Sequence, residues 1–191
     1  MNFEQYSYVA FLLAIIGYIP YIINTIKGTT RPHIYSWLVS SIMSMIIFGI
    51  QLSEQVGISM FVTLFITLIC LVILVLGLKN GNRDIKKVDS IFLILSLVTL
   101  IYWLFEQDNL VAAILTAIIP NLAFIPTIRK TWEHPYSETL FTYLTSIFRN
   151  SFLLLSFTHY SLPAIINPVV TIVVLSLFSL LVIGRRIYIN S

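Results

Sequence analysis

Arg149 is the residue whose type and position could do the most specific chemistry, because it stands in the middle of an apolar run from Leu140 to Phe157. If this run crosses a membrane, an arginine at its centre costs about 3 kcal/mol, so a compensating partner is expected. A guanidinium has a planar fork of donors that matches a carboxylate or a phosphate. We therefore predict that Arg149 binds an anionic or strongly polar solute. The alternative is a structural role, in which Arg149 extends to Glu106 or Asp108 or is held by backbone carbonyls.

Four polar residues are further candidates for the same binding site. Ser146 lies three residues before Arg149, so helical spacing places both on one face that can turn away from lipid. Asn150 is adjacent in sequence but points about 100° away around the helix. The other two amides stand beside prolines in other apolar runs, Asn121 after Pro120 and Asn167 before Pro168. Each amide could instead hydrogen-bond a neighbouring helix.

Pro20 and Pro120 occupy corresponding places in two apolar runs and are candidate hinges. A proline inside a helix removes one hydrogen bond and frees the carbonyl four residues earlier, here that of Ile16 or Thr116. Tyr21, which follows Pro20, is a candidate gating residue beside the first hinge. The alternative is a static kink that packing absorbs.

Small polar residues recur at helical spacing on two other apolar runs. One stripe is Ser36, Ser40 and Ser44, and the other is Thr63, Thr67 and Cys70. Small residues let membrane helices approach closely, so we interpret both stripes as packing surfaces rather than pocket linings.

The elements that position these residues follow from composition. Of 191 residues, 58% are hydrophobic and 10% are charged, which leaves too few charges for the surface of a soluble domain. A helix needs roughly 20 apolar residues to cross a bilayer. Seven runs qualify, and we predict an all-α transmembrane protein with spans near Tyr6 to Ile26, Tyr35 to Leu52, Val56 to Leu78, Ser90 to Phe105, Leu110 to Ile128, Leu140 to Phe157 and Leu162 to Ile183.

The charges in the connections distinguish the two ends of these spans. All Lys and Arg residues except Arg149 follow the first, third, fifth or seventh run, whereas the other connections hold acidic residues such as Glu54. Positive loops stay in the cytoplasm, so we predict an outside N-terminus and a cytoplasmic C-terminus. The first five residues carry Glu4 and no Lys or Arg, so we expect the first run to belong to the mature fold rather than to a signal peptide.

The segment around Pro20 is repeated around Pro120. In each, a Thr-Ile-basic sequence follows the proline, at Thr25 and at Thr127, and a second proline with Tyr and Ser opens the next run. Repeats of three spans point the same way only if a single helix separates them. We therefore predict a 3+1+3 arrangement, with a first repeat at 1–79, a cytoplasmic loop plus linker helix at 80–108, and a second repeat at 109–191.

This arrangement resembles the SWEET and PQ-loop superfamily of seven-helix transporters. The motif likeness lies in residues 20–31, which read as a PQ-loop motif with Tyr21 in place of the glutamine, while Asn121 stands there in the second repeat. The resemblance implies a carrier that works by alternating access, with Pro20 and Pro120 bending the two bundles and Asn167 in a central pocket. The same fold also serves a receptor, so a receptor-like or scaffolding membrane protein without transport is the alternative.

Other function classes are disfavoured. The chain has no His-Glu-x-x-His or Gly-x-Ser-x-Gly motif and no pair of mid-membrane aspartates, so we expect no enzyme and no catalytic residue. His33, His134 and His159 lie on both sides of the membrane, so we expect no metal site, and nothing indicates a cofactor. We expect membrane lipid and a small-molecule solute as partners, no nucleic acid, and a multi-pass location in a prokaryotic cytoplasmic (inner) membrane. Homo-oligomerisation stays open.

Overall fold

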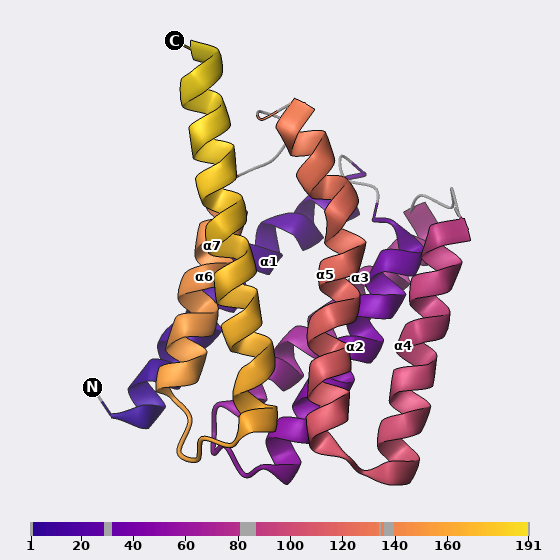
Figure 1. Ribbon diagram of the computed structural model, residues 1–191, viewed down its shortest axis with the longest axis vertical. Coiled ribbons are helices and arrows are strands. Elements are labelled where there is room, and N and C mark those ends of the chain that lie inside the picture. The colour runs from indigo at the N-terminus through magenta and orange to yellow at the C-terminus, as the bar shows by residue number, and fades with distance from the viewer. Residues whose placement is uncertain (1, 29–31, 81–86, 134, 136–139, 191) are drawn as a thin grey trace.

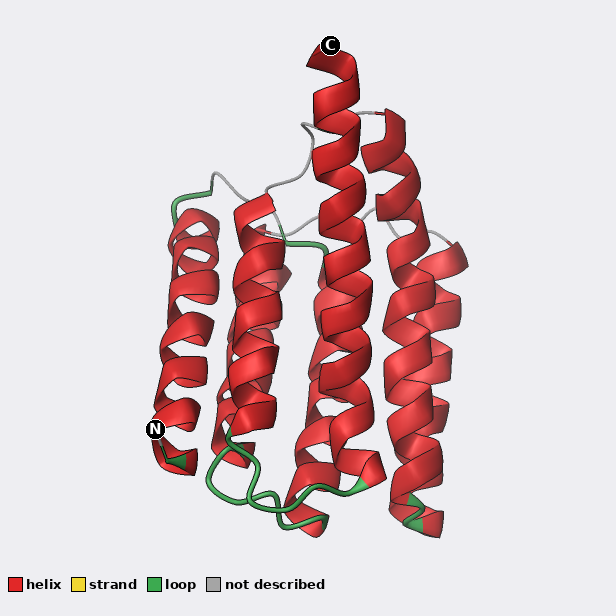
Figure 2. Ribbon diagram, turned by 60° about the vertical axis from the view of Figure 1, so that its left-hand side comes forward, coloured by secondary structure: helices red, strands yellow, loops and turns green. Residues whose placement is uncertain are grey.

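The computed structural model describes residues 2–28, 32–80, 87–133, 135 and 140–190, and these residues are helical apart from the connections. The helices run side by side in one bundle (Figures 1 and 2). They are α1 (Phe3–Ile26), α2 (Ile34–Ser53), α3 (Met60–Asn80), α4 (Lys87–Glu106), α5 (Asn109–Glu133), α6 (Leu140–Leu155) and α7 (Leu162–Asn190).

Five helices of the described part of the chain are long and apolar enough to cross a membrane, namely α1, α2, α3, α4 and α7. The apolar parts described for α5 and α6, Asn109–Ile125 and Leu140–Leu155, are shorter. The expectation of seven spans is thus confirmed for five helices. α6 is short because the chain leaves the helix after Leu155 instead of continuing to Phe157.

The outer surface is apolar and the interior is partly polar. Large apolar side chains are exposed on every helix, for example Leu12, Leu68 and Leu177. Many buried residues are Ser or Thr whose hydroxyls bond a carbonyl one turn earlier in the same helix, as in Thr67 and Thr145. This distribution suits lipid as the surrounding solvent, and the protein is an all-helical, multi-pass membrane protein.

Besides α6, the boundaries of α3, α5 and α7 differ from the sequence prediction, and α5 continues to Glu133, beyond the expected end at Ile128. α3 begins at Met60 rather than near Val56, because Gly57 adopts a positive φ of 90° and the chain turns there. α7 continues to Asn190, beyond the expected end at Ile183. Of the basic residues expected in the loops, Arg31, Arg83 and Lys86 lie outside the described residues, as does His134.

The packing order of the helices is similar in the two halves of the chain. α3 packs against both α1 and α2, and α7 packs against both α5 and α6. Between the halves, α1 meets α6 and α2 meets α5, while α4 lies against α2 and α5. The chain begins at one end of the bundle and finishes at the other (Figure 1).

The connection 54–59 and the connection 156–161 meet at the end of the bundle where the chain begins. The backbone N–H of Thr158 donates to the Val56 carbonyl at 3.0 Å, and the side chains of Val56 and Phe157 are fully buried. Gly57 and Thr158 are so close that a Cβ on Gly57 would lie 2.7 Å from the Thr158 Oγ1. We call this junction the loop closure; Figure 2 shows its loops in green at the lower end.

Candidate functional site

Arg149 projects from the middle of α6 toward α1 and α3. Its Cζ lies 5.8 Å from the centroid of the Tyr18 ring, and its side chain also interacts with the Tyr18 hydroxyl. The Cys70 thiol of α3 lies within the electrostatic reach of the guanidinium, and Ser44 of α2 lies beside the same thiol. Four helices thus contribute to one group of polar residues, which we call the central cluster: Tyr18, Ser44, Cys70 and Arg149.

The positive charge of Arg149 has no carboxylate partner among the described residues. In the described part of the chain, an ion pair joins His33 and Asp89 instead, with 3.6 Å between the His33 Nε2 and the Asp89 Oδ2. Asp108 caps α5 by accepting from two backbone N–H groups in its first turn. The link from Arg149 to Glu106 or Asp108 that the sequence left open is not formed.

The Nε atom of Arg149 is buried, and no hydrogen-bond partner for it exists in the described part of the chain. Most buried hydroxyls of the described residues bond a carbonyl of their own helix, as in Thr67 and Thr145, but a guanidinium at the end of a long side chain points away from its helix. An unpaired buried donor costs about 1–3 kcal/mol, and more when the group is charged. A positive charge with an unpaired donor is chemically suited to a carboxylate or a phosphate, and anion binding at Arg149 stays a prediction.

Two of the candidate asparagines use their donors within their own helices. Nδ2 of Asn150 donates to the Ser146 carbonyl at 2.8 Å, and Nδ2 of Asn121 donates to the Ala117 carbonyl at 2.6 Å. Asn150 is buried, whereas Ser146 and Asn121 are half-buried. Neither of these bonds joins one helix to another.

Asn167 connects two helices at the second proline. Its Nδ2 donates to the Thr116 carbonyl at 3.3 Å. That carbonyl is the one that lacks a helical N–H partner because of Pro120, and Thr116 is fully buried. Asn167 therefore compensates for the break in α5 and ties α7 to α5. Whether Asn167 also lines a pocket stays a prediction.

Tyr21 contacts α2 immediately after the first proline. The indole Nε1 of Trp37 donates to the Tyr21 hydroxyl at 3.2 Å, and the two ring centroids are 5.1 Å apart. Pro20 itself is exposed and Tyr21 is half-buried. This contact joins the end of α1 to the start of α2.

A cavity of about 660 Å³ lies between α2, α4 and α5. This volume is in the range of small-ligand sites. Ser36 and Ser40 line the cavity, so the interpretation of their stripe as a packing surface is wrong for these two residues, whereas Ser44 is in the central cluster. The remaining polar or hinge residues on the lining are Tyr35, Asp89 and Pro120.

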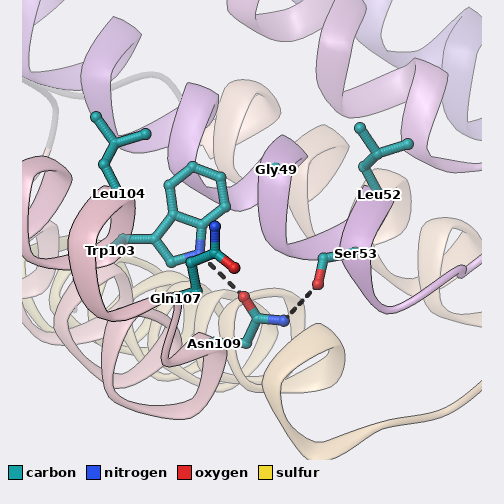
Figure 3. Close-up of a pocket in the computed structure, with 7 residues that line it drawn as sticks. All are labelled: Gly49, Leu52, Ser53, Trp103, Leu104, Gln107 and Asn109. Atoms are coloured by element: carbon teal, nitrogen blue, oxygen red, sulfur yellow. Dashed lines mark hydrogen bonds between the residues drawn. The ribbon is translucent and has the colours of Figure 1, made fainter.

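A smaller cavity of about 320 Å³ lies near the opposite end of α2, beside Trp103 of α4 (Figure 3). The indole packs so closely on Gly49 that a Cβ there would lie 2.7 Å from its Cζ2. Nε1 of Trp103 donates to Oδ1 of Asn109 at 2.9 Å, and Nδ2 of Asn109 donates to the Ser53 hydroxyl at 2.7 Å. These contacts fasten α4 to α2 and to the start of α5.

Two features of the structure were not predicted from the sequence, namely the buried amide of Gln51 and the packing of Trp103 on Gly49. Gln51 is 1% exposed, and neither its side-chain nitrogen nor its oxygen has a partner among the described residues. In the sequence, Gln51 is visible only as a single amide within an apolar run, seven residues after Ser44. The close packing of Trp103 on Gly49 depends on a contact between helices, which residue spacing does not reveal.

Comparison with protein-family models, curated proteins and solved structures finds no match to this chain. The likeness to the SWEET and PQ-loop superfamily therefore rests on the sequence alone and stays a prediction.

Proposed function

We propose that the protein is a membrane carrier that moves a small polar, anionic solute by alternating access, and that Arg149 binds the negative charge of the solute. The observation that carries the proposal is a half-buried arginine that has no carboxylate partner among the described residues and whose buried Nε is unpaired there. A carboxylate or phosphate would supply both the missing charge and the missing acceptor.

The packing order of the helices supports a 3+1+3 arrangement of two parallel repeats in this proposal. α3 lies against the other two helices of the first triplet, and α7 lies against the other two of the second. If α1, α2 and α3 correspond to α5, α6 and α7, the contact between α1 and α6 corresponds to the contact between α5 and α2, and both contacts are present. A twofold axis along the membrane normal would relate the two contacts in this way. Basic residues lie at or near the C-terminal ends of α1, α3, α5 and α7, several of them within the helices, as do Arg129 in α5 and Arg185 in α7. This placement favours a cytoplasmic C-terminus. Location in the inner membrane of a prokaryote is a further part of the proposal.

Pro20 and Pro120 would be the hinges of the two triplets, as the family resemblance implies. Pro120 lines the larger cavity, so bending of α5 would change the shape of that cavity. The loop closure joins the triplets at the other end of the bundle, which would be the outer end. The arrangement is consistent with a solute path that is closed outside and approached from the cytoplasm.

The test is uptake of labelled succinate and labelled inorganic phosphate into proteoliposomes. We expect saturable uptake by the wild type for at least one of these anions. Arg149→Met should lower uptake about 10- to 100-fold, because charge-assisted hydrogen bonds contribute about 1.5–3 kcal/mol. Arg185→Met is a matched control, since it removes a guanidinium that also stacks on an aromatic ring, 4.6 Å from the centroid of Trp132, but at the end of α7.

Two outcomes would contradict the carrier proposal. Unchanged uptake by Arg149→Met would show that the anion binds elsewhere. Saturable binding of an anion without any uptake would favour the receptor-like alternative over the carrier.

A further inference from the structure

Gln51, in the last turn of α2, has a side-chain amide whose hydrogen bonds are unaccounted for. The residue is 1% exposed, and its Nε2 and Oε1 have no partner among the described residues. Buried serines on the same helix are satisfied locally, since Ser41 donates to the Trp37 carbonyl and Ser44 to the Ser41 carbonyl. Buried polar groups are almost always paired with protein, water or ligand, so a partner from outside the chain is expected at Gln51.

Gln51 lies on the face of α2 that carries Ser44. A different face packs on apolar residues of α4 and α5, through Val39, Met43, Ile46 and Ile50. Ser44 instead meets Cys70 of α3. Seven residues complete almost two helical turns, which places Gln51 above Ser44 and about 10 Å further along the axis.

The opposing surface of α3 is also polar between these two levels. α2 and α3 are antiparallel neighbours, so the level of Gln51 corresponds to a residue seven positions before Cys70, which is Thr63. Thr63 and Thr67 are both buried, and the Thr67 hydroxyl donates to the Thr63 carbonyl. A line of buried polar residues, here called the polar seam, therefore runs from the central cluster to Gln51 through Thr67 and Thr63.

The polar seam ends directly at the loop closure. The backbone carbonyl of Gln51 accepts from the Val56 N–H at 3.2 Å, and the Val56 carbonyl accepts from Thr158. A solute that passed between the loop closure and Arg149 would therefore meet Gln51 first. Gln51 and Arg149 also supply three of the four buried side-chain atoms without partners in the described part of the chain, the fourth being Oγ of Ser179.

We propose that Gln51 is a second solute-binding residue, which holds a neutral group of the solute while Arg149 holds its anionic group. This inference rests on the proposed function of Arg149. A primary amide offers both donors and an acceptor, so it matches a group that also does both, such as a carboxamide or a hydroxyl. The solute is then a carboxylate or phosphate that bears such a group several atoms away.

The experiment compares two probes of equal carbon number, adipamate and hexanoate, which share a carboxylate but differ in a terminal carboxamide. Their affinities for the purified protein are measured by calorimetric titration. We expect adipamate to bind the wild type about tenfold more tightly, the effect of one or two hydrogen bonds. Gln51→Leu should abolish this ratio and leave hexanoate binding unchanged. Met43→Leu, on the other face of α2, should leave both affinities unchanged.

The outcomes separate this inference from the proposed function. Equal binding of the two probes to the wild type, or binding of neither, overturns the assignment of Gln51. If hexanoate and inorganic phosphate bind and Arg149→Met weakens the binding of both, the proposed function stands. This holds even if the carboxamide of adipamate adds no affinity, in which case Gln51 holds only water. If Arg149→Met weakens neither, the proposed function fails.

Thermal unfolding of the ligand-free variant gives a second readout. A binding amide without internal partners is dispensable for folding, so Gln51→Leu should unfold at the wild-type temperature or above it. A clear decrease would mean that the amide makes structural hydrogen bonds, and it would overturn the inference.

Discussion

The bond from Asn167 to the Thr116 carbonyl can be tested by restoring the N–H that Pro120 lacks. Asn167→Leu removes the donor, which lies 3.3 Å from the carbonyl oxygen, and leaves this fully buried acceptor unpaired. Pro120→Ala supplies a backbone N–H four residues after Thr116, where a helical hydrogen bond to the same carbonyl can form. In the Pro120→Ala background, loss of the asparagine should therefore have little effect.

The size of this coupling follows from the geometry and burial of the bond. An unpaired buried acceptor costs about 1–3 kcal/mol. The observed distance of 3.3 Å is at the long end of the usual range for such bonds, which favours the lower part of that interval. Bonds between membrane helices average about 0.6 kcal/mol and reach about 1.7 kcal/mol. We expect Asn167→Leu to lower the free energy of unfolding by about 1 kcal/mol in the wild type and by close to zero beside Pro120→Ala.

The measurement is reversible unfolding of the four proteins of the cycle in mixed detergent micelles, followed by circular dichroism. Asn150→Leu is the matched control, because the Asn150 amide bonds a carbonyl within its own helix and no proline is involved. Its effect should be the same with Pro120 or with alanine at that position. If Asn167→Leu and Pro120→Ala are additive within about 0.3 kcal/mol, the compensation of the proline by Asn167 is refuted.

Two glycines give further predictions. Gly49→Ala should lower the free energy of unfolding by about 1–3 kcal/mol, because the new Cβ would collide with the Trp103 ring. Adding Trp103→Leu to Gly49→Ala should recover part of the loss. An unchanged unfolding temperature of Gly49→Ala would contradict the close packing. Gly57→Ala should increase hydrogen exchange in 54–59 and 156–161, since φ is +90° there and Thr158 lies 2.7 Å from the new Cβ. Gly184→Ala, which meets nothing within 4 Å, is the control for both variants.

Composition and charge were sufficient to predict the helical, membrane-spanning character of the chain. Long apolar runs exclude a soluble surface, and five of the predicted spans are confirmed by length and composition. Boundaries were less predictable because the apolar run near Val56 continues through a turn. There the positive φ of Gly57 and the hydrogen bonds of the loop closure, rather than hydropathy, decide that α3 begins at Met60.

The candidate site was predictable only where a residue was exceptional for its surroundings. Arg149 could be selected because a charge within an apolar run requires a partner. Tyr18 and Cys70 belong to other helices, so their closeness to Arg149 depends on packing that spacing within one run does not determine. Gln51 resembled an ordinary polar residue near a helix end until its burial and unpaired amide were known.

The two prolines are not equivalent in their surroundings, and this difference constrains any bending of the helices. At Pro120, the freed carbonyl of Thr116 is bonded to Asn167, so α5 can bend there only by breaking this bond or by moving α7 with it. At Pro20, no side chain of the described residues donates to the corresponding Ile16 carbonyl, and Tyr21 is attached to α2 rather than to α3. If the chain alternates between two states, α5 and α7 should therefore move together, whereas α1 can change its angle to α3. Larger distance changes are then expected between labels on α1 and α3 than between labels on α5 and α7.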